Sequence, residues 1–190
     1  MADPTTLYLL RHGEIDRPTV AQFEDAVLTE RGLEQVHSLV LAWPHPAPEM
    51  IYCSRLARSV ETASICAAVF RKPIRAMQYL GEWAATEKDV PQETYKEWER
   101  RCWADFNHQN DEGESLHHAT DRVVGALVKI AEQHRGRPVL VSGHAILFSL
   151  FEAYVRGEQA TEASKNRIGF AYYAIVEYTR EFRIVREFAP

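Results

Sequence analysis

The sequence is poor in cysteine, lacks long apolar stretches and carries no excess of positive charge. Its three cysteines form an odd set without a pairing pattern, which favours a reducing compartment over a disulfide framework. No apolar run approaches the roughly 20 residues of a membrane-spanning helix, and the N-terminus lacks a signal-peptide pattern. A net charge of -5 argues against a general binder of nucleic acid or anionic membranes. We therefore expect a soluble, cytoplasmic protein.

The composition is otherwise that of an ordinary folded domain. Of the 190 residues, 46% are hydrophobic and 26% are charged, and this length allows a sizeable core. We expect one domain over residues 1–190, with a small cap-like excursion at about 83–113, where the chain becomes charged and aromatic. Tyr95, Trp98 and Phe106 share one face of a predicted helix there, which favours a packing surface over a substrate platform.

Short apolar runs alternate with segments of helical periodicity along most of the chain. In chain order we expect strand 7–10, helix 29–43, strand 50–53, helix 54–70, strand 73–80, helix 114–136, strand 138–142 and helix 145–155. Thr29 and Ser54 are expected to cap the helices that follow them. Two further runs, 170–178 and 182–188, predict a hairpin. The alternation predicts an α/β three-layer sandwich whose mainly parallel sheet ends in an antiparallel C-terminal hairpin.

Polar residues stand just beyond the carboxyl ends of three predicted strands. Arg11 and His12 follow the first strand, Arg58 follows the second, and His144 follows the fourth. Ligands bind beyond the carboxyl ends of parallel strands in such sheets, so we expect these side chains to converge. Two guanidinium groups and two imidazoles would form a compact pocket for a tetrahedral phosphate.

The two histidines can have different roles in such a pocket. A neutral His12 is a competent nucleophile toward phosphorus, and neighbouring arginines disfavour its protonation. Gly13 removes steric crowding beside it and allows close backbone approach. A protonated His144 would donate hydrogen bonds to the phosphate oxygens. A carboxylic acid must then protonate the leaving oxygen and later activate water.

Sequence blocks in a fixed order resemble the histidine phosphatase superfamily, also called phosphoglycerate mutase-like. The blocks are "LLRHGE" (9–14), "LTERGLEQ" (28–35), "SRLARSVETA" (54–63), "LGE" (80–82), "GES" (113–115) with Arg122, and "VLVSGHAI" (139–146). Together they cover most of the chain. The resemblance implies the phosphoglycerate mutase-like arrangement of this family, which agrees with the three-layer sandwich inferred above. Ribazole phosphatases of this family are similar to the chain in length and in the "GES" block.

The resemblance also implies a role for each candidate residue. It implies that His12 becomes a phosphohistidine, that Arg11, Arg58 and His144 bind the phosphoryl group, and that Glu82 donates the proton. It further implies a small-molecule phosphate ester as substrate, with no metal and no organic cofactor. His117 and His118 have no carboxylate or cysteine spacing that supports metal binding.

Three departures from the family pattern bear on the site. The segment around Glu82 lacks the usual glycines, so that Glu87 or Asp89 could replace it as proton donor. Pro18 stands near the position of a common asparagine. Ala145 follows the second histidine, where the family usually has glycine.

Three functions remain open at this point. The first is hydrolysis of a phosphate monoester through phosphohistidine, and the second is mutase-type transfer between hydroxyls of a sugar acid. The third is a noncatalytic domain that binds a phospho-ligand or a partner. A mutase must exclude water beneath an enclosing cap, and the excursion 83–113 is shorter than the insertions of family mutases. We therefore favour the phosphatase.

Overall fold

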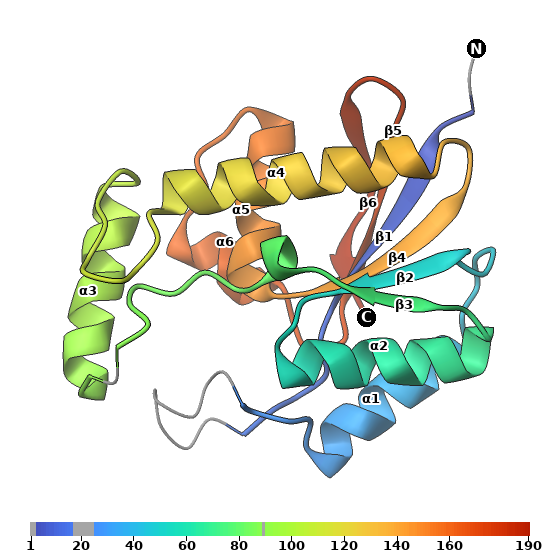
Figure 1. Cartoon of the computed structure of the whole chain (residues 1–190), viewed down its shortest axis with the longest axis horizontal. Coiled ribbons are helices and arrows are strands. Elements are labelled where there is room, and N and C mark those ends of the chain that lie inside the picture. Colours follow the sequence, from blue (N-terminus) through green and yellow to red (C-terminus); the bar gives the residue numbers. More distant parts are fainter. Residues whose placement is uncertain (1–2, 17–24, 89) are drawn as a thin grey trace.

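The computed structural model describes residues 3–16, 25–88 and 90–190, which form a six-stranded mixed sheet between two helical layers (Figure 1). The strands are β1 (Thr5–Arg11), β2 (Met50–Cys53), β3 (Ile74–Ala76), β4 (Pro138–Gly143), β5 (Tyr173–Tyr178) and β6 (Phe182–Ala189). The helices are α1 (Glu30–Leu41), α2 (Ala57–Phe70), α3 (Gln92–Ala104), α4 (Leu116–Gln133), α5 (Ala145–Arg156) and α6 (Glu162–Arg167).

The strand order in the sheet is β3-β2-β4-β1-β5-β6. The first four strands in this order pair in parallel. β5 pairs antiparallel with β1, and β6 pairs antiparallel with β5. The predicted sandwich, with its mainly parallel sheet and C-terminal hairpin, is therefore confirmed.

Successive residues of β1 face two different cores. Leu7 and Leu9 pack with α4 and α5, whereas Tyr8 and Leu10 pack with α1 and α2 (Figure 1). Both faces of the sheet are covered, which explains why the strand is apolar at consecutive positions rather than at alternate ones. The polar residues that follow Leu10 begin where this double cover ends.

Two local features differ from the sequence predictions. The strand expected over 73–80 is limited to Ile74–Ala76, because the chain then turns into a short 3-10 helix at Gln78–Leu80. Helix α6 was not predicted. It has no buried residues, and a capping box between Thr161 and Ser164 defines its start. Because α6 buries no apolar face, its sequence has no periodic apolar pattern that would predict a helix.

The segment 83–113 carries α3, which lies at one end of the molecule (Figure 1). Its aromatic side chains, among them Tyr95 and Trp98, pack against a buried cluster that contains Trp83. An ion pair between Glu99 of α3 and Lys165 of α6 joins the segment to the rest of the fold. The interpretation of this aromatic face as a packing surface is confirmed.

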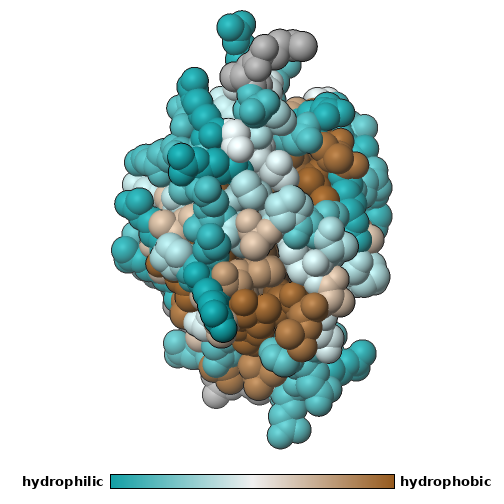
Figure 2. Space-filling model, turned by 90° about the vertical axis from the view of Figure 1, so that its right-hand side faces the viewer, coloured by the Kyte–Doolittle hydropathy of each residue, from teal (hydrophilic) through white to brown (hydrophobic). Residues whose placement is uncertain are grey.

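The surface away from α3 is mostly hydrophilic, with separate apolar areas between the polar ones (Figure 2). The carboxyl ends of β2 and β4 point away from this side and toward α3 (Figure 1). Within the part of the chain that the structure describes, none of the helices combines the length and hydropathy needed to span a membrane.

The cysteines are buried, free thiols. Burial raises the pKa of Cys53 to about 11 and that of Cys66 to about 12. Thiols with such pKa values stay protonated at neutral pH and are poor nucleophiles. The cysteines are therefore core residues, as expected, rather than part of a reactive site.

Candidate active site

His12 follows the end of β1 and is only 2% exposed. Its backbone N–H donates to the carbonyl of Gly143 at 3.0 Å, which ties it to the end of β4. Its Nδ1 lies 2.8 Å from the carbonyl oxygen of Gly13. A carbonyl oxygen only accepts hydrogen bonds, so Nδ1 carries the proton. In the neutral ring, Nε2 therefore keeps the lone pair that a nucleophile requires.

The loop after His12 is held by the "LTERGLEQ" block. Thr29 caps α1 by accepting a hydrogen bond from the amide of Gly32, as its position in the sequence predicts. The N–H of Thr29 donates to the carbonyl of Glu14 at 2.9 Å. The side-chain oxygen of Gln35 accepts from the amide of Glu14 at 3.0 Å. The start of α1 thus fixes the loop on both sides of Glu14.

Two glycines allow α1 and this loop to approach each other closely. A Cβ on Gly13 would lie 2.5 Å from the carbonyl oxygen of Gly32, and a Cβ on Gly32 would overlap the carbonyl of Glu14. The close backbone approach expected at Gly13 therefore exists, and its partner is α1.

We expect Gly32→Ala to lower the free energy of unfolding by about 2–3 kcal/mol, because the loop backbone must move to admit a methyl group. Gly125→Ala in α4 is the matched control, since a Cβ there meets no described atom within 4 Å. This control should raise the free energy of unfolding by about 0.5–1 kcal/mol. Urea denaturation of both variants measures the difference, and equal effects would contradict the close approach.

Arg58 lies in the first turn of α2 and is fully buried. Thr62, one turn later, donates its hydroxyl to the carbonyl of Arg58 at 2.8 Å. The same hydroxyl accepts the amide of Gly13 at 3.2 Å. These two bonds tie the "SRLARSVETA" block to the loop of His12, so that both blocks belong to one rigid unit.

Arg11 is the last residue of β1, and Phe170 lies beside it. The guanidinium carbon of Arg11 is 4.0 Å from the centroid of the Phe170 ring, which places the cation against the ring. Arg11 also donates to the carbonyl of Ile168. The Phe170 ring centroid is 5.6 Å from that of His12. The aromatic ring therefore borders both the guanidinium group and the imidazole.

His144 is the residue before α5 and is fully buried. Its ring centroid is 5.2 Å from that of His12. Burial lowers the pKa of His144 well below its ordinary value, and the nearby positive charges of Arg58 and Arg11 lower it further. The free protein therefore holds this imidazole neutral. The protonated form expected from the sequence would require the compensating negative charge of a bound anion.

Glu82 lies at the N-terminal end of α5, where His144 is the N-cap. One carboxylate oxygen accepts from the amides of Trp83 and Leu147, both at 3.0 Å. The other accepts from the amide of Ile146 at 3.1 Å. Because Ile146 and Leu147 belong to the first turn of α5, the helix end that His144 caps holds the carboxylate.

The "GES" block and Arg122 hold the chain on both sides of Glu82. Arg122 forms two hydrogen bonds with the carboxylate of Glu114, at 2.8 and 2.7 Å. It also donates to the carbonyl of Gly81 at 3.0 Å. The carbonyl of Glu114 accepts from the indole N–H of Trp83 at 2.6 Å. Gly81 and Trp83, the two neighbours of Glu82, are therefore anchored to this ion pair.

The remaining sequence candidates take other positions. Glu87 is exposed, and Asp89 and Pro18 lie outside the described residues. Ala145 is the first residue of α5, where the helix continues without a need for glycine. Gly143, which precedes His144 in the sequence, is the position that requires glycine, because a Cβ there would lie 2.5 Å from the ring of Phe148.

Among the described residues, no group of three or more His, Cys, Asp or Glu side chains is arranged to hold a metal ion. His117 is exposed on α4 and lies 3.7 Å from the carboxylate of Asp121, one turn along the same helix. This contact is that of a surface side chain.

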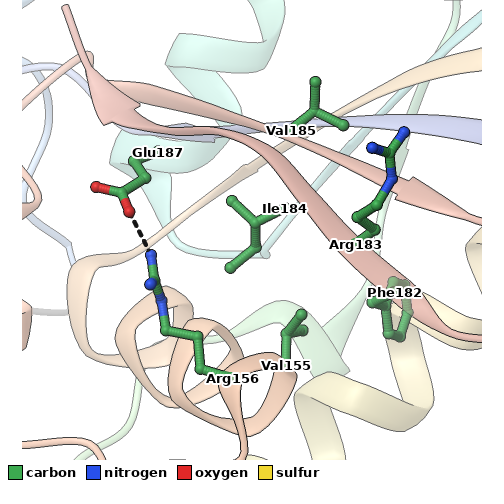
Figure 3. A pocket seen from close by; sticks show the side chains of 7 residues that line it. All are labelled: Val155, Arg156, Phe182, Arg183, Ile184, Val185 and Glu187. Carbon is green, nitrogen blue, oxygen red and sulfur yellow. Dashed lines mark hydrogen bonds and ion pairs between the residues drawn. The ribbon is translucent and has the colours of Figure 1, made fainter.

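A separate hollow of about 430 Å³ lies between the end of α5 and β6 (Figure 3). Val155 and Ile184 contribute apolar side chains, and Arg156 forms an ion pair with Glu187 at 2.6 Å. None of the histidines and arginines described above lines it. The hollow is therefore distinct from the candidate active site.

Known proteins resemble the chain over most of its length. The sequence profile of the histidine phosphatase superfamily (branch 1) matches residues 7–189. The adenosylcobalamin/alpha-ribazole phosphatase of Escherichia coli is 23% identical over 190 residues, covering 95% of this chain and 93% of that protein. The metal-independent phosphoserine phosphatase of Arabidopsis thaliana is 28% identical over 184 residues, covering 86% of this chain and 73% of that protein.

Solved structures show the same fold. Bacillus stearothermophilus YhfR superposes with a TM-score of 0.80 at 22% identity, with 96% of both chains covered. The mycobacterial glucosyl-3-phosphoglycerate phosphatase superposes with a TM-score of 0.79 at 18% identity, covering 98% of this chain and 100% of that one. At these identities the likeness establishes the architecture.

Proposed function

The chain belongs to the histidine phosphatase superfamily, and we propose that it hydrolyses a small-molecule phosphate monoester through a phosphohistidine at His12. The observation that carries this proposal is the hydrogen bond from Nδ1 of His12 to the carbonyl of Gly13. It leaves Nε2 as the unprotonated ring nitrogen, on a buried imidazole next to the buried ring of His144.

The proposed reaction has two steps. In the first, Nε2 of His12 forms a bond to phosphorus, the ester P–O bond breaks, and Glu82 gives a proton to the leaving oxygen. In the second, water attacks phosphorus, the P–N bond breaks, and Glu82 takes up the proton of the water. Inorganic phosphate then leaves, and both residues return to their starting forms.

The surrounding cations stabilise the charge on the transferred group. Arg11 and Arg58 carry fixed positive charge, and their planar guanidinium groups match the geometry of phosphate oxygens. His144 supplies a further hydrogen-bond donor to the transferred group in this scheme. Groups that are held in place before the substrate binds need little reorganisation during the transfer.

Hydrolysis is favoured over mutase-type transfer because the named relatives are phosphatases. Their names also suggest the first substrates to test, namely phosphoserine, α-ribazole phosphate and glucosyl-3-phosphoglycerate. The packing of α3 through its aromatic face gives the segment 83–113 a structural role.

The purified chain is expected to release inorganic phosphate from p-nitrophenyl phosphate in the presence of a metal chelator. The same assay on the three named esters then ranks the substrates. Phosphate binding without turnover would support a noncatalytic domain instead. Transfer between the hydroxyls of phosphoglycerate that outpaces hydrolysis would support a mutase. Either result would contradict the proposed phosphatase.

A further inference from the structure

Ser54 contacts the second histidine directly, although it is 90 residues away in the sequence. Both side chains are fully buried. The hydroxyl oxygen of Ser54 lies 2.8 Å from Nε2 of His144. It also accepts a hydrogen bond from the amide of Leu56 at 3.3 Å. The sequence predicts that Ser54 caps α2, but the N-cap of that helix is Leu56, and Ser54 serves His144 instead.

Nδ1, the other ring nitrogen of His144, makes no such contact within the described ranges. Among the residues that the structure describes, its Nδ1 is buried and has no hydrogen-bond partner. Buried polar atoms are nearly always paired in folded proteins, so an unpaired one calls for an explanation. Because this ring lies next to that of His12, a phosphate group bound to His12 is the natural partner.

The two neutral forms of His144 leave different numbers of unsatisfied groups. If Nε2 carried the proton and donated to Ser54, the hydroxyl proton of Ser54 and the lone pair of Nδ1 would both be unpaired. If Ser54 donates to Nε2, its hydroxyl gives one hydrogen bond and accepts one from Leu56. Only the Nδ1 proton then remains, and a phosphate oxygen is an ideal acceptor for it.

We propose that Ser54 is a positioning residue that keeps the proton of neutral His144 on Nδ1, from which it is donated to an oxygen of the bound phosphate. The role of the phosphate rests on the proposed function, whereas the position of the proton does not. Ser54 acts through His144 and touches neither the reacting phosphorus nor the leaving group in this arrangement.

Nitrogen NMR of the ¹⁵N-histidine-labelled chain measures the position of the proton directly. Long-range spectra correlate each ring carbon proton with its nitrogen and separate protonated from unprotonated nitrogens. The His144→Gln variant identifies the signals of His144 by their loss. Without phosphate, we expect the proton of the wild-type ring on Nδ1. A wild-type ring with its proton on Nε2 would overturn the proposal.

Three variants extend this test. Ser54→Ala removes the donor and should shift the proton of His144 toward Nε2, with inorganic phosphate bound about tenfold more weakly. Ser54→Thr keeps a hydroxyl and should restore Nδ1–H and the phosphate affinity. Ser64→Ala is the matched control on α2, because Ser64 is exposed and bonds only its own helix, at the carbonyl of Val60. It should change neither quantity.

An unchanged proton position in Ser54→Ala would also overturn the proposal. The outcome is separable from that of the proposed function. A chain with Nδ1–H on His144 but no turnover would refute the phosphatase and leave the role of Ser54 intact. A chain that turns over normally with the proton of His144 on Nε2 would refute the role of Ser54 and leave the phosphatase intact.

Discussion

His12→Ala is expected to abolish phosphate release, with kcat/KM lowered by roughly 10⁴-fold or more, because the variant lacks the nitrogen that bonds to phosphorus. The arginines and His144 would remain, so inorganic phosphate should still bind. Steady-state kinetics and phosphate titration of the same preparation measure both quantities.

His117→Ala is the matched control for this substitution. His117 is exposed on α4, and its loss should leave turnover unchanged. Circular dichroism and thermal unfolding check that His12→Ala keeps its fold, because the replaced side chain is buried. We expect the fold to be kept, since the backbone hydrogen bonds of residue 12 remain available. Normal turnover by a folded His12→Ala variant would refute the nucleophilic role.

Glu82→Gln is expected to slow the hydrolysis of alkyl phosphates by about 10²–10³-fold, because their leaving oxygen needs a proton as the bond breaks. The loss for p-nitrophenyl phosphate should be only several-fold, since its leaving group is stable as an anion. A series of phosphate esters with different leaving groups measures this dependence. An equal loss across the series would mean that Glu82 acts only by holding α5.

Glu82 also has a structural role, which a stability measurement can detect separately from its effect on the reaction. The carboxylate accepts three amide hydrogen bonds, two of them from the start of α5. Glutamine keeps only one acceptor oxygen, so we also expect a stability loss of about 1 kcal/mol. Glu87→Gln serves as comparison, because Glu87 is the exposed alternative donor. A leaving-group-dependent loss in Glu87→Gln, and not in Glu82→Gln, would reassign the acid.

The sequence predicted those parts of the fold that local pattern encodes. The run Leu7–Leu10 is apolar because both of its faces are covered, and α4, within the helix predicted over 114–136, buries an apolar stripe that includes Val123 and Leu127. The helix α6 escaped prediction, and β3 is shorter than the strand predicted over 73–80, for the opposite reason. Neither buries a continuous apolar face, and backbone hydrogen bonds and caps define them instead.

The convergence of the site was also predictable in outline. Parallel strands bring their carboxyl ends to one edge of the sheet, which places His12 near His144. The contacts that refine the site join residues far apart in sequence, such as Ser54 with His144 and Glu82 with the start of α5. No local pattern encodes such pairs, so only the structure reveals them.

Trapping the phosphorylated protein tests the central claim most directly. The chain is mixed with a radiolabelled phosphate ester, quenched during turnover in alkali, and digested into peptides for mass spectrometry. We predict one acid-labile phosphoryl group, located on the ring of His12 and absent from the His12→Ala variant. Turnover without any labelled protein, or with the label on another residue, would contradict the account.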